Sequence, residues 1–344
     1  MIDFVRCSSQ IPLTQEHFVR ELWHPVTLQD GSMMLWHRTR AVSVHYYLNS
    51  QRLVISGKLI TLLYDTQVSN FDDLYGNMKE QFIDEFNAQI NSLFTEPVVD
   101  IRDFVVTRID YCFNVETPYV TQYIDFLTTA FERTNTGSRV NHTARHGLHN
   151  SVYIKNTAEY EQNRRYNYTL NVYDKSDRLR YQRNRRERIS EADFALAENV
   201  LRIEVQASHQ FIKSICEKFS CSRRFAELFD YRVAFWSISR VFALVYHMTP
   251  QMQIYTYKEA VRRVTKGSAA QKTLFSAATN HPVLDKKYAY GRKTLAAQDI
   301  YPYCLLPKTS PVASLPSPMQ LILEKDGMYW DSERVRFDGL SEVN

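Results

Sequence analysis

Strict alternation of polar and apolar residues in three separate segments is the feature that most constrains the fold of this chain. In VVTRIDYCFN, the polar face carries Arg108, Asp110, Cys112 and Asn114. Neighbouring side chains of a strand point to opposite faces of a sheet, so residues two apart share a face. The pattern therefore predicts a strand with one polar and one apolar face.

Two later segments repeat this alternation. YTLNVYDK has a polar face made of Thr169, Asn171, Tyr173 and Lys175, and LRIEVQ has one made of Arg202, Glu204 and Gln206. If the three strands are neighbours, one polar surface contains Asp110, Tyr173, Lys175 and Glu204. An antiparallel sheet with one face in water produces the same pattern, so both interpretations stay open at this point.

The other segments indicate an α+β fold with a mainly antiparallel sheet core, helices packed on one side, and a helical C-terminal region. Helical spacing is clear in GNMKEQFIDEFNAQINSLF and in YVTQYIDFLTTAF, and SVYIK and YTLNVYDK read as a hairpin. Ser190 is expected to cap a short helix. We therefore expect a catalytic domain over 1–210, a helical basic region over 211–304, and a flexible C-terminal tail over 305–344, which begins in a Pro- and Ser-rich segment.

Composition excludes several classes of protein. No segment approaches 18 consecutive apolar residues, and the first residues lack the layout of a secretory signal. The five cysteines show no C-x-x-C spacing, which favours reduced thiols over a disulfide framework or a zinc site. No nucleotide-binding G-x-x-x-x-G-K-[ST] motif occurs. We expect a cytoplasmic protein that does not bind membranes and carries no helicase motor.

The net charge of +4 is modest, but the basic residues are concentrated in two stretches. Residues 164–188 hold nine Lys or Arg against three acids, and residues 258–293 hold nine against two. Guanidinium groups suit phosphates, and the interleaved Tyr166, Tyr168 and Tyr181 suit unstacked bases. A solvated charged surface is the common alternative. The predicted DNA contacts are Arg108, Arg164, Arg165, Arg178, Arg180, Arg183, Arg185, Arg186, Arg202, Arg262, Arg263 and Lys266.

The shared polar surface also has a chemical logic. Two carboxylates, Asp110 and Glu204, are hard oxygen ligands suited to Mg²⁺ or Mn²⁺, which would polarise a phosphodiester. The hydroxyl of Tyr173 can attack phosphorus and hold one DNA end covalently. Lys175 can lower the pKa of that tyrosine or neutralise charge in the transition state.

Three short blocks carry a resemblance to a known family. Arg108-Ile109-Asp110, the run from Leu170 to Lys175, and Leu201-Arg202-Ile203-Glu204-Val205 resemble, in order and spacing, the replication initiators of filamentous-phage gene II type and the trans-acting plasmid Rep proteins. Ser151-Val152-Tyr153 and the segment SGKLITLLYDTQVSNFDDL add to it, so the resemblance covers roughly residues 50 to 210. Where the family usually has Gly and then an acid after Tyr-x-Lys, this chain has Ser176 and Asp177.

The resemblance implies a bacterial rolling-circle replication initiator encoded by a phage or a plasmid. In that family, Tyr173 would be the nicking nucleophile, Asp110 and Glu204 the metal ligands, and Lys175 the support for the tyrosine. Such proteins cut one strand at an origin that is single-stranded or cruciform, keep the 5′ end as a phosphotyrosine, and later rejoin the strand. The implied partners are origin DNA, a host helicase and a host polymerase, and a homodimer stays open.

Several alternatives also stay open. Tyr153, Tyr168 and Tyr181 lie near Tyr173 in the chain, so a second tyrosine is undecided, and packing or DNA stacking is the expected role of each. A cluster of His142, His146 and His149 allows a metal or phosphate role, but the adjacent Asn, Thr and Gly favour a loop. A non-enzymatic origin-binding protein and a conjugative relaxase are the competing functions, and the missing His-x-His pair counts against the relaxase.

Overall fold

A computed structural model describes residues 2–39, 41–58, 61, 77–134, 140–142, 151–157, 166–185, 189–265, 305–306 and 310–325. The chain forms two compact units, each built from two separate parts of the sequence. Unit 1 contains Met1–Cys112 and Val205–Ser237, and unit 2 contains Phe113–Glu204 and Ile238–Asn344. The units therefore interleave along the chain, whereas the sequence analysis expects three consecutive regions.

Unit 1 is built around antiparallel strands in the order β2-β3-β4-β5-β1-β6. The strands are β2 (His24–Thr27), β3 (Met33–Arg38), β4 (Val42–Tyr47), β5 (Arg52–Lys58), β1 (Ile2–Gln10) and β6 (Val105–Glu116). Residues of one face are fully buried in the middle of this sheet, among them Val5, Cys7 and Ile55. Burial raises the pKa of the Cys7 thiol, which marks this face as the apolar core of unit 1.

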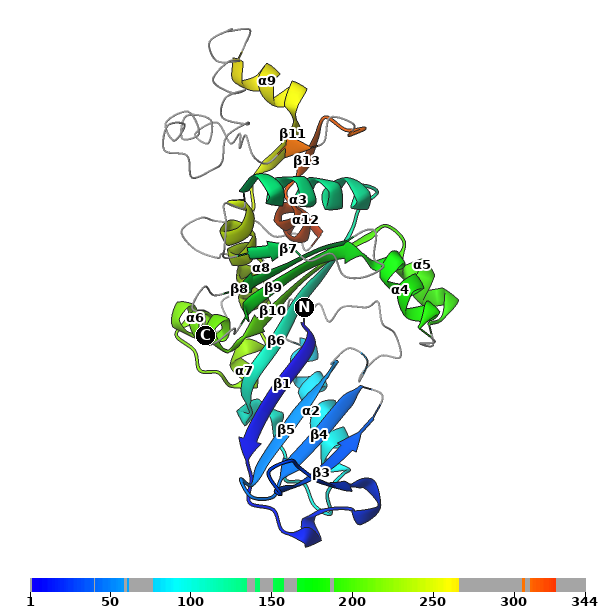
Figure 1. The fold of residues 1–344 in the computed structure, drawn as a ribbon, viewed down its shortest axis with the longest axis vertical. Coiled ribbons are helices and arrows are strands. Elements are labelled where there is room, and N and C mark those ends of the chain that lie inside the picture. The colour runs from blue at the N-terminus through cyan, green and yellow to red at the C-terminus, as the bar shows by residue number, and fades with distance from the viewer. Residues whose placement is uncertain are drawn as a thin grey trace. The chain divides into compact units, whose positions relative to one another are not determined.

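Helix α2 (Asn77–Asn91) lies against the strands of unit 1 (Figure 1) and confirms the helix predicted there. Its spacing buries Phe82, Ile83, Phe86 and Ile90 on one side. The ring of Phe82 meets that of Phe229 edge-on, with centroids 5.3 Å apart, so α2 also packs beside the segment that follows α7 (Phe225–Leu228).

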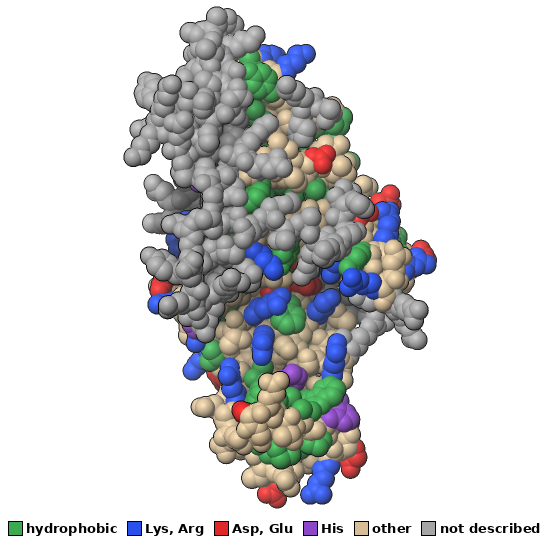
Figure 2. Space-filling model, viewed as in Figure 1, with side chains coloured by type: hydrophobic (Ala, Val, Ile, Leu, Met, Phe, Trp, Pro, Cys, Tyr) green, Lys and Arg blue, Asp and Glu red, His purple; other side chains and the backbone are tan. Residues whose placement is uncertain are grey.

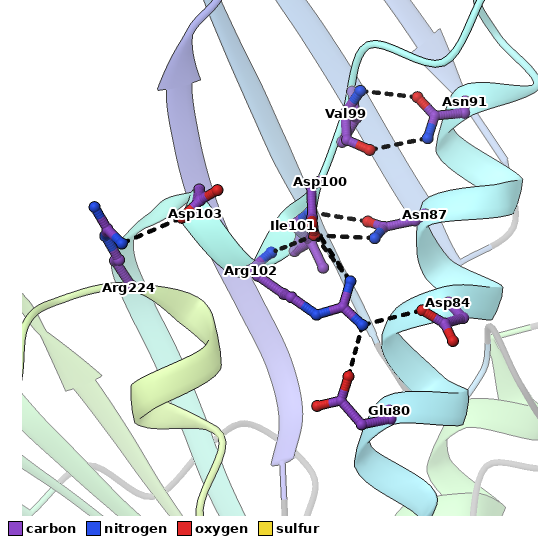
Figure 3. Close-up of polar contacts among 10 residues, drawn as sticks. All are labelled: Glu80, Asp84, Asn87, Asn91, Val99, Asp100, Ile101, Arg102, Asp103 and Arg224. Atoms are coloured by element: carbon purple, nitrogen blue, oxygen red, sulfur yellow. Dashed lines mark hydrogen bonds and ion pairs between the residues drawn. The ribbon is translucent and has the colours of Figure 1, made fainter.

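Polar contacts fix the other side of α2 to the short helix η3 (Ile101–Asp103) and the residues before it (Figure 3). The amide of Asn91 accepts a hydrogen bond from the backbone nitrogen of Val99 and donates one to its carbonyl oxygen, both 2.9 Å long. Arg102 reaches Glu80 at 2.6 Å. These bonds fix the position of α2 beside the residues that lead into β6.

Unit 2 contains the strand order β6-β10-β9-β8-β7. Besides β6, the strands are β10 (Val200–Ser208), β9 (Tyr166–Asp174), β8 (Ser151–Thr157) and β7 (Val140–His142). β8 and β9 pair antiparallel, which confirms the predicted hairpin. β10 lies between β6 and β9, so the three alternating segments are neighbouring strands, an arrangement that the sequence leaves open. β6 and β10 contribute residues to both units.

Helices complete the two units. Unit 2 contains α3 (Val120–Thr134), α4 (Lys175–Asn184), α5 (Glu191–Ala197) and α9 (Tyr257–Thr265). Unit 1 contains α6 (His209–Phe219), and both units share α8 (Tyr231–Tyr246). The hydroxyl of Ser190 accepts a hydrogen bond from the backbone nitrogen of Asp193, so the predicted cap of α5 is confirmed. None of the helices among the described residues is long and apolar enough to cross a membrane.

The start of the predicted flexible tail is ordered instead. β12 (Leu305–Leu306) and β13 (Ser314–Pro316) flank β11 (Gln253–Thr256) in a small three-stranded sheet. Helix α12 (Pro318–Lys325) follows, with Met319, Ile322 and Leu323 buried. The hydroxyl of Tyr123 in α3 donates a 2.9 Å bond to the carbonyl of Pro316. Apolar residues inside the Pro- and Ser-rich segment therefore pack into unit 2. The composition of the segment resembles that of a linker, but the burial of these residues shows that it is part of the fold. With its mainly antiparallel strands and surrounding helices, the chain has the predicted α+β fold.

Candidate active site

Tyr173 lies near the end of β9, on the polar face of that strand. Leu170 and Val172 point to the opposite face and are fully buried. In the pairing with β8, Ser151 lies opposite Tyr173, and Tyr153 lies opposite Asn171. Directly paired residues of antiparallel strands share a face, so Ser151 and Tyr153 belong to the same polar surface as Tyr173.

A carboxylate on β10 accepts the hydroxyl proton of Tyr173. The hydroxyl donates to Glu204 Oε1 over 2.6 Å, and Asn171 Nδ2 donates to Glu204 Oε2 over 3.3 Å. Tyr173 is only 5% exposed and Glu204 only 7%. A short bond between two shielded groups orients the phenol oxygen toward a carboxylate that can take its proton.

Arg202 fixes the position of this carboxylate. Its Nε donates to Glu204 Oε1 over 2.6 Å, and its NH1 donates to Asn114 Oδ1 of β6 over 3.2 Å. Arg202 is 0% exposed, so the prediction that it contacts DNA is wrong for this conformation. Residues on both faces of β10 from Val200 to Val205 are buried, and the guanidinium balances the buried charge of Glu204.

Lys175 is placed differently from the expectation. The sequence analysis puts it on the strand face of Tyr173, but β9 ends at Asp174 and Lys175 is the first residue of α4. The carboxylate of Asp174 accepts hydrogen bonds from the backbone nitrogens of Ser176 and Asp177, which starts the helix. Lys175 remains next to the site in sequence and is 5% exposed.

Asp110, the other predicted metal ligand, lies in the part of β6 that belongs to unit 1. It is 4% exposed and forms a two-bond ion pair with Arg108, at 2.9 Å to Arg108 Nε and 2.6 Å to NH2. The guanidinium of Arg108 also lies over the ring of Phe4, 4.7 Å from its centroid. Arg108 is therefore engaged within unit 1.

The donors present do not form a metal site as they are arranged. Both oxygens of Glu204 accept hydrogen bonds from protein groups, one of them from the guanidinium of Arg202. Within the described ranges, no three His, Cys, Asp or Glu residues are grouped so that they would hold an ion. The arrangement is suited to proton transfer from Tyr173 and does not match a divalent cation, which needs several free oxygen ligands.

One polar atom of this surface lacks a partner. The hydroxyl of Ser151 is buried and makes no hydrogen bond among the described residues. Buried polar atoms are nearly always paired, so this hydroxyl is a place where a substrate atom would find a donor. The alternation in SVYIK puts Ser151 on the face of Tyr153, but no sequence pattern indicates that its hydroxyl is buried without a hydrogen bond.

Comparison with known proteins finds likeness among solved structures. No protein-family model matches the chain, and no curated protein matches its sequence. Among solved structures, the chain is similar to the rolling circle replication initiator protein from Geobacillus stearothermophilus, at 9% identity and a TM-score of 0.33. The match covers 64% of this chain and 78% of that one.

Four of the predicted DNA contacts lie in α4 or directly after it, namely Arg178, Arg180 and Arg183 in the helix and Arg185 at its C-terminal cap. The guanidinium groups of Arg178 and Arg185 lie over the ring of Tyr181, 5.5 and 4.6 Å from its centroid. Arg180 pairs with Asp177 at 2.6 Å, and Arg183 pairs with Glu191 at 2.9 Å. Among the described residues, Arg178 and Arg185 make no ion pair with an acid, so their charge is available to a phosphate.

In α9, Arg262 and Arg263 both bind Glu259, at 2.8 and 2.9 Å. Hydrogen bonds from the two guanidinium groups lower the pKa of Glu259 to about 2. This pairing within one helix neutralises part of the positive charge that was predicted to bind DNA.

Other predicted residues lie outside those that the structure describes, namely Arg164, Arg165, Arg186, Lys266, His146 and His149. His142 belongs to β7.

The neighbouring tyrosines differ in their positions. Tyr153 shares the polar face of Tyr173, whereas Tyr168 points to the other face of β9, since it is an odd number of residues away. Burial raises the pKa of Tyr168 to about 12. Tyr181 lies on α4. Of the three, Tyr153 is the one on the surface of Tyr173.

Proposed function

We propose that this chain initiates rolling-circle DNA replication by nicking one strand with Tyr173 as the nucleophile. The observation that carries the proposal is the 2.6 Å hydrogen bond from the Tyr173 hydroxyl to Glu204, with Arg202 bound to the same carboxylate oxygen. A tyrosine already directed at a shielded base is the arrangement that transesterification requires. The resemblance of the three sequence blocks to phage and plasmid initiators supports DNA as the substrate.

In the proposed reaction, the proton of Tyr173 passes to Glu204 as the phenolate oxygen attacks the phosphorus. A bond forms between the tyrosine oxygen and phosphorus, and the bond from phosphorus to the 3′ oxygen breaks. The leaving oxygen takes a proton from solvent and becomes the 3′ hydroxyl that a polymerase extends. The 5′ end stays on Tyr173 until the reverse reaction rejoins the strand.

Other residues have supporting roles in this proposal. The amine of Lys175 balances negative charge that develops on the phosphate, and the Ser151 hydroxyl donates a hydrogen bond to it. Arg202 acts through Glu204 and is a positioning residue. Because Tyr173 is 5% exposed, side chains that cover it move when the phosphate enters.

We also propose that the reaction needs a divalent metal ion, and only the sequence resemblance supports this requirement. Mg²⁺ or Mn²⁺, held by Asp110 and Glu204, would polarise the phosphodiester. Origin DNA, a host helicase, a host polymerase and a second copy of the chain are proposed partners on the same basis.

The test is a nicking assay on a supercoiled plasmid that carries this chain's gene and its flanking sequence. The protein is incubated with Mg²⁺ or Mn²⁺, and relaxed circles are measured together with protein retained on DNA 5′ ends. We expect both products from the native protein and neither from Tyr173→Phe, because the phenylalanine keeps the ring and removes the nucleophile.

Tyr168→Phe is the matched control, since it makes the same change on the same strand but on the opposite face. It should nick at the native rate. Full nicking by Tyr173→Phe, or loss of nicking in Tyr168→Phe alone, would refute the assignment of the nucleophile.

A non-enzymatic DNA-binding protein is the second candidate function. The burial of Tyr173 and the available charge of Arg178 and Arg185 beside Tyr181 favour it. It predicts that the native protein and Tyr173→Phe bind the plasmid equally and that neither cuts it.

A further inference from the structure

The strand register of unit 1 brings basic residues together on the face of the sheet opposite its apolar core. Paired residues share a face, so a row can be followed from strand to strand. Arg38 pairs with Ser43, Ser43 with Ser56, Ser56 with Arg6, and Arg6 with Arg108. This row, which we call the arginine row, crosses five strands and spans roughly 19 Å, at about 4.8 Å per strand.

A neighbouring row supplies rings. His24 pairs with Trp36, and Trp36 pairs with His45. The rings of His24 and Trp36 have centroids 5.2 Å apart. Next to this row, Tyr47 pairs with Arg52. Rings therefore lie beside guanidinium groups on one face of the sheet, as they do on surfaces that stack unpaired bases and bind their phosphates.

The charged side chains on this face of the sheet are mainly positive. The same register puts Lys58 opposite Phe4 and Phe4 opposite Asp110, so the acid that the described strands β1, β5 and β6 place on this face is the one already paired with Arg108. Arg6, Arg38, Arg52 and Lys58 are exposed. Figure 2 shows Lys and Arg side chains, with His among them, gathered over the strands of unit 1 and few Asp or Glu side chains there.

The opposite face explains why these side chains point outward. Val5, Cys7, Val44, Leu53 and Ile55 alternate with them along the same strands and are buried in the core. A sheet that needed only to be soluble would mix both charge signs on its outer face. Here the charged residues that point outward are mainly basic, so this face has a positive charge that complements a polyanion.

We propose that the arginine row, together with Trp36, His45 and Tyr47, is a binding surface for single-stranded DNA. Phosphates bind Arg6 and Arg38, and bases stack on the ring of Trp36. The choice of DNA rests on the proposed function, whereas the surface itself rests on the register and charge of unit 1. Single strands fit because their unpaired bases reach a flat sheet, whereas the bases of a duplex are hidden in the stack.

The test measures binding of a labelled thymidine oligonucleotide of about 20 nucleotides by fluorescence anisotropy, over a range of salt concentrations. All variants are made in the full-length chain with Tyr173→Phe, so that cleavage does not interfere. The double variant Arg6→Gln, Arg38→Gln should bind about 25-fold more weakly at 0.1 M salt, because each phosphate contact contributes a factor of about 5. The slope of log affinity against log salt should fall by about 1.4.

The matched control is Lys213→Gln, Lys218→Gln, which removes two exposed positive charges of α6 in the same unit. It should leave both the affinity and the slope unchanged. Trp36→Ala should weaken binding about 5- to 150-fold, and Trp36→Phe should restore most of the loss because it keeps a ring. Equal urea midpoints for all variants exclude misfolding as the cause.

The outcomes separate the surface from the reaction. Loss of binding in the arginine double variant with native binding in the lysine pair supports the surface, even if the plasmid assay finds no nicking. Equal losses in both pairs, or no loss in either, overturn it. Tighter binding of duplex DNA or of RNA than of the single strand overturns the proposed occupant. Failure of the nicking assay alone overturns only the proposed function.

Discussion

Glu204 Oε1 receives two hydrogen bonds of 2.6 Å, one from the hydroxyl of Tyr173 and one from Nε of Arg202. The same oxygen thus serves as acceptor for the proposed nucleophile and as partner of a fully buried guanidinium. Glu204 therefore contributes both to the stability of unit 2, through Arg202, and to the proposed reaction, through Tyr173. Substitutions of Arg202 and of Glu204 measure these two contributions separately.

Replacing Arg202 should destabilise the protein strongly. Arg202→Ala leaves Glu204 shielded without its cation, a change that costs about 3–5 kcal/mol for buried pairs. Urea unfolding followed by circular dichroism measures this loss. Arg180→Ala, which breaks the exposed pair with Asp177, is the control and should cost less than about 1 kcal/mol. Similar costs for the two variants would show that Arg202 does not neutralise Glu204.

Glu204→Gln should abolish nicking and leave DNA binding intact. The amide keeps the size of the side chain but takes no proton from Tyr173, so we expect a loss of 10²-fold or more, on the order of general-base effects. Single-turnover nicking and oligonucleotide anisotropy, measured on the same preparation, give the two readouts. A variant that nicks at the native rate would contradict the role of Glu204 as base.

Ser151→Ala tests the hydroxyl without a partner. Removing a buried and unpaired polar atom should leave the free energy of unfolding unchanged or raise it by about 1–3 kcal/mol. If the hydroxyl binds the phosphate, nicking should fall at the same time. A more stable protein with slower nicking is the expected pair of results. Lower stability would mean that the hydroxyl is bonded in the folded protein.

Metal removal tests the part of the proposal that the donor arrangement does not support. Dialysis against EDTA should stop nicking, and Mg²⁺ or Mn²⁺ should restore it, if Asp110 and Glu204 hold an ion as the resemblance implies. Asp110→Asn should then need a higher metal concentration for half-maximal nicking. Nicking that persists in EDTA would leave proton transfer to Glu204 as the sufficient chemistry.

The proposed DNA surface makes a pH prediction. Burial, and after it the positive charge of Arg6, lowers the pKa of His45 below its usual value. Arg6→Gln should therefore raise the pKa of His45, which an NMR titration of its ring protons measures. Because the folded protein binds this proton less readily than the unfolded chain, the contribution of His45 to stability is present above about pH 6.5 and falls as pH drops below it. An unchanged pKa in Arg6→Gln would place the two side chains apart.

Local sequence patterns predicted most of the elements around the candidate site. Period-two alternation is a direct consequence of strand geometry, so β6, β9 and β10 could be recognised, and Ser190 could be recognised as a cap. Adjacency of the strands was a conditional expectation, and it depends on pairing between distant residues that no local pattern contains.

The positions of Lys175 and Arg202 were predicted wrongly because other interactions override the alternating pattern. Alternation continues through Lys175, but the carboxylate of Asp174 binds the next backbone nitrogens and begins a helix there. Alternation in LRIEVQ indicates a polar face, yet β10 is a central strand with both faces buried, so Arg202 lies inside. The arginine row was missed because it joins residues from five strands, each of which contributes one side chain.

The interleaving of the two units has a consequence for synthesis of the chain on the ribosome. Unit 1 needs Val205–Ser237, where the carbonyl of Leu228 accepts the hydroxyl of the buried Tyr111 and Phe229 packs on Phe82. The residues of unit 2 from Phe113 to Glu204 are translated in between, which takes roughly 5–20 seconds at about 5–20 residues per second. During that interval the apolar face of β1 and β5 lacks the contacts that Val205–Ser237 supplies. We therefore expect chaperones to bind nascent chains of this length.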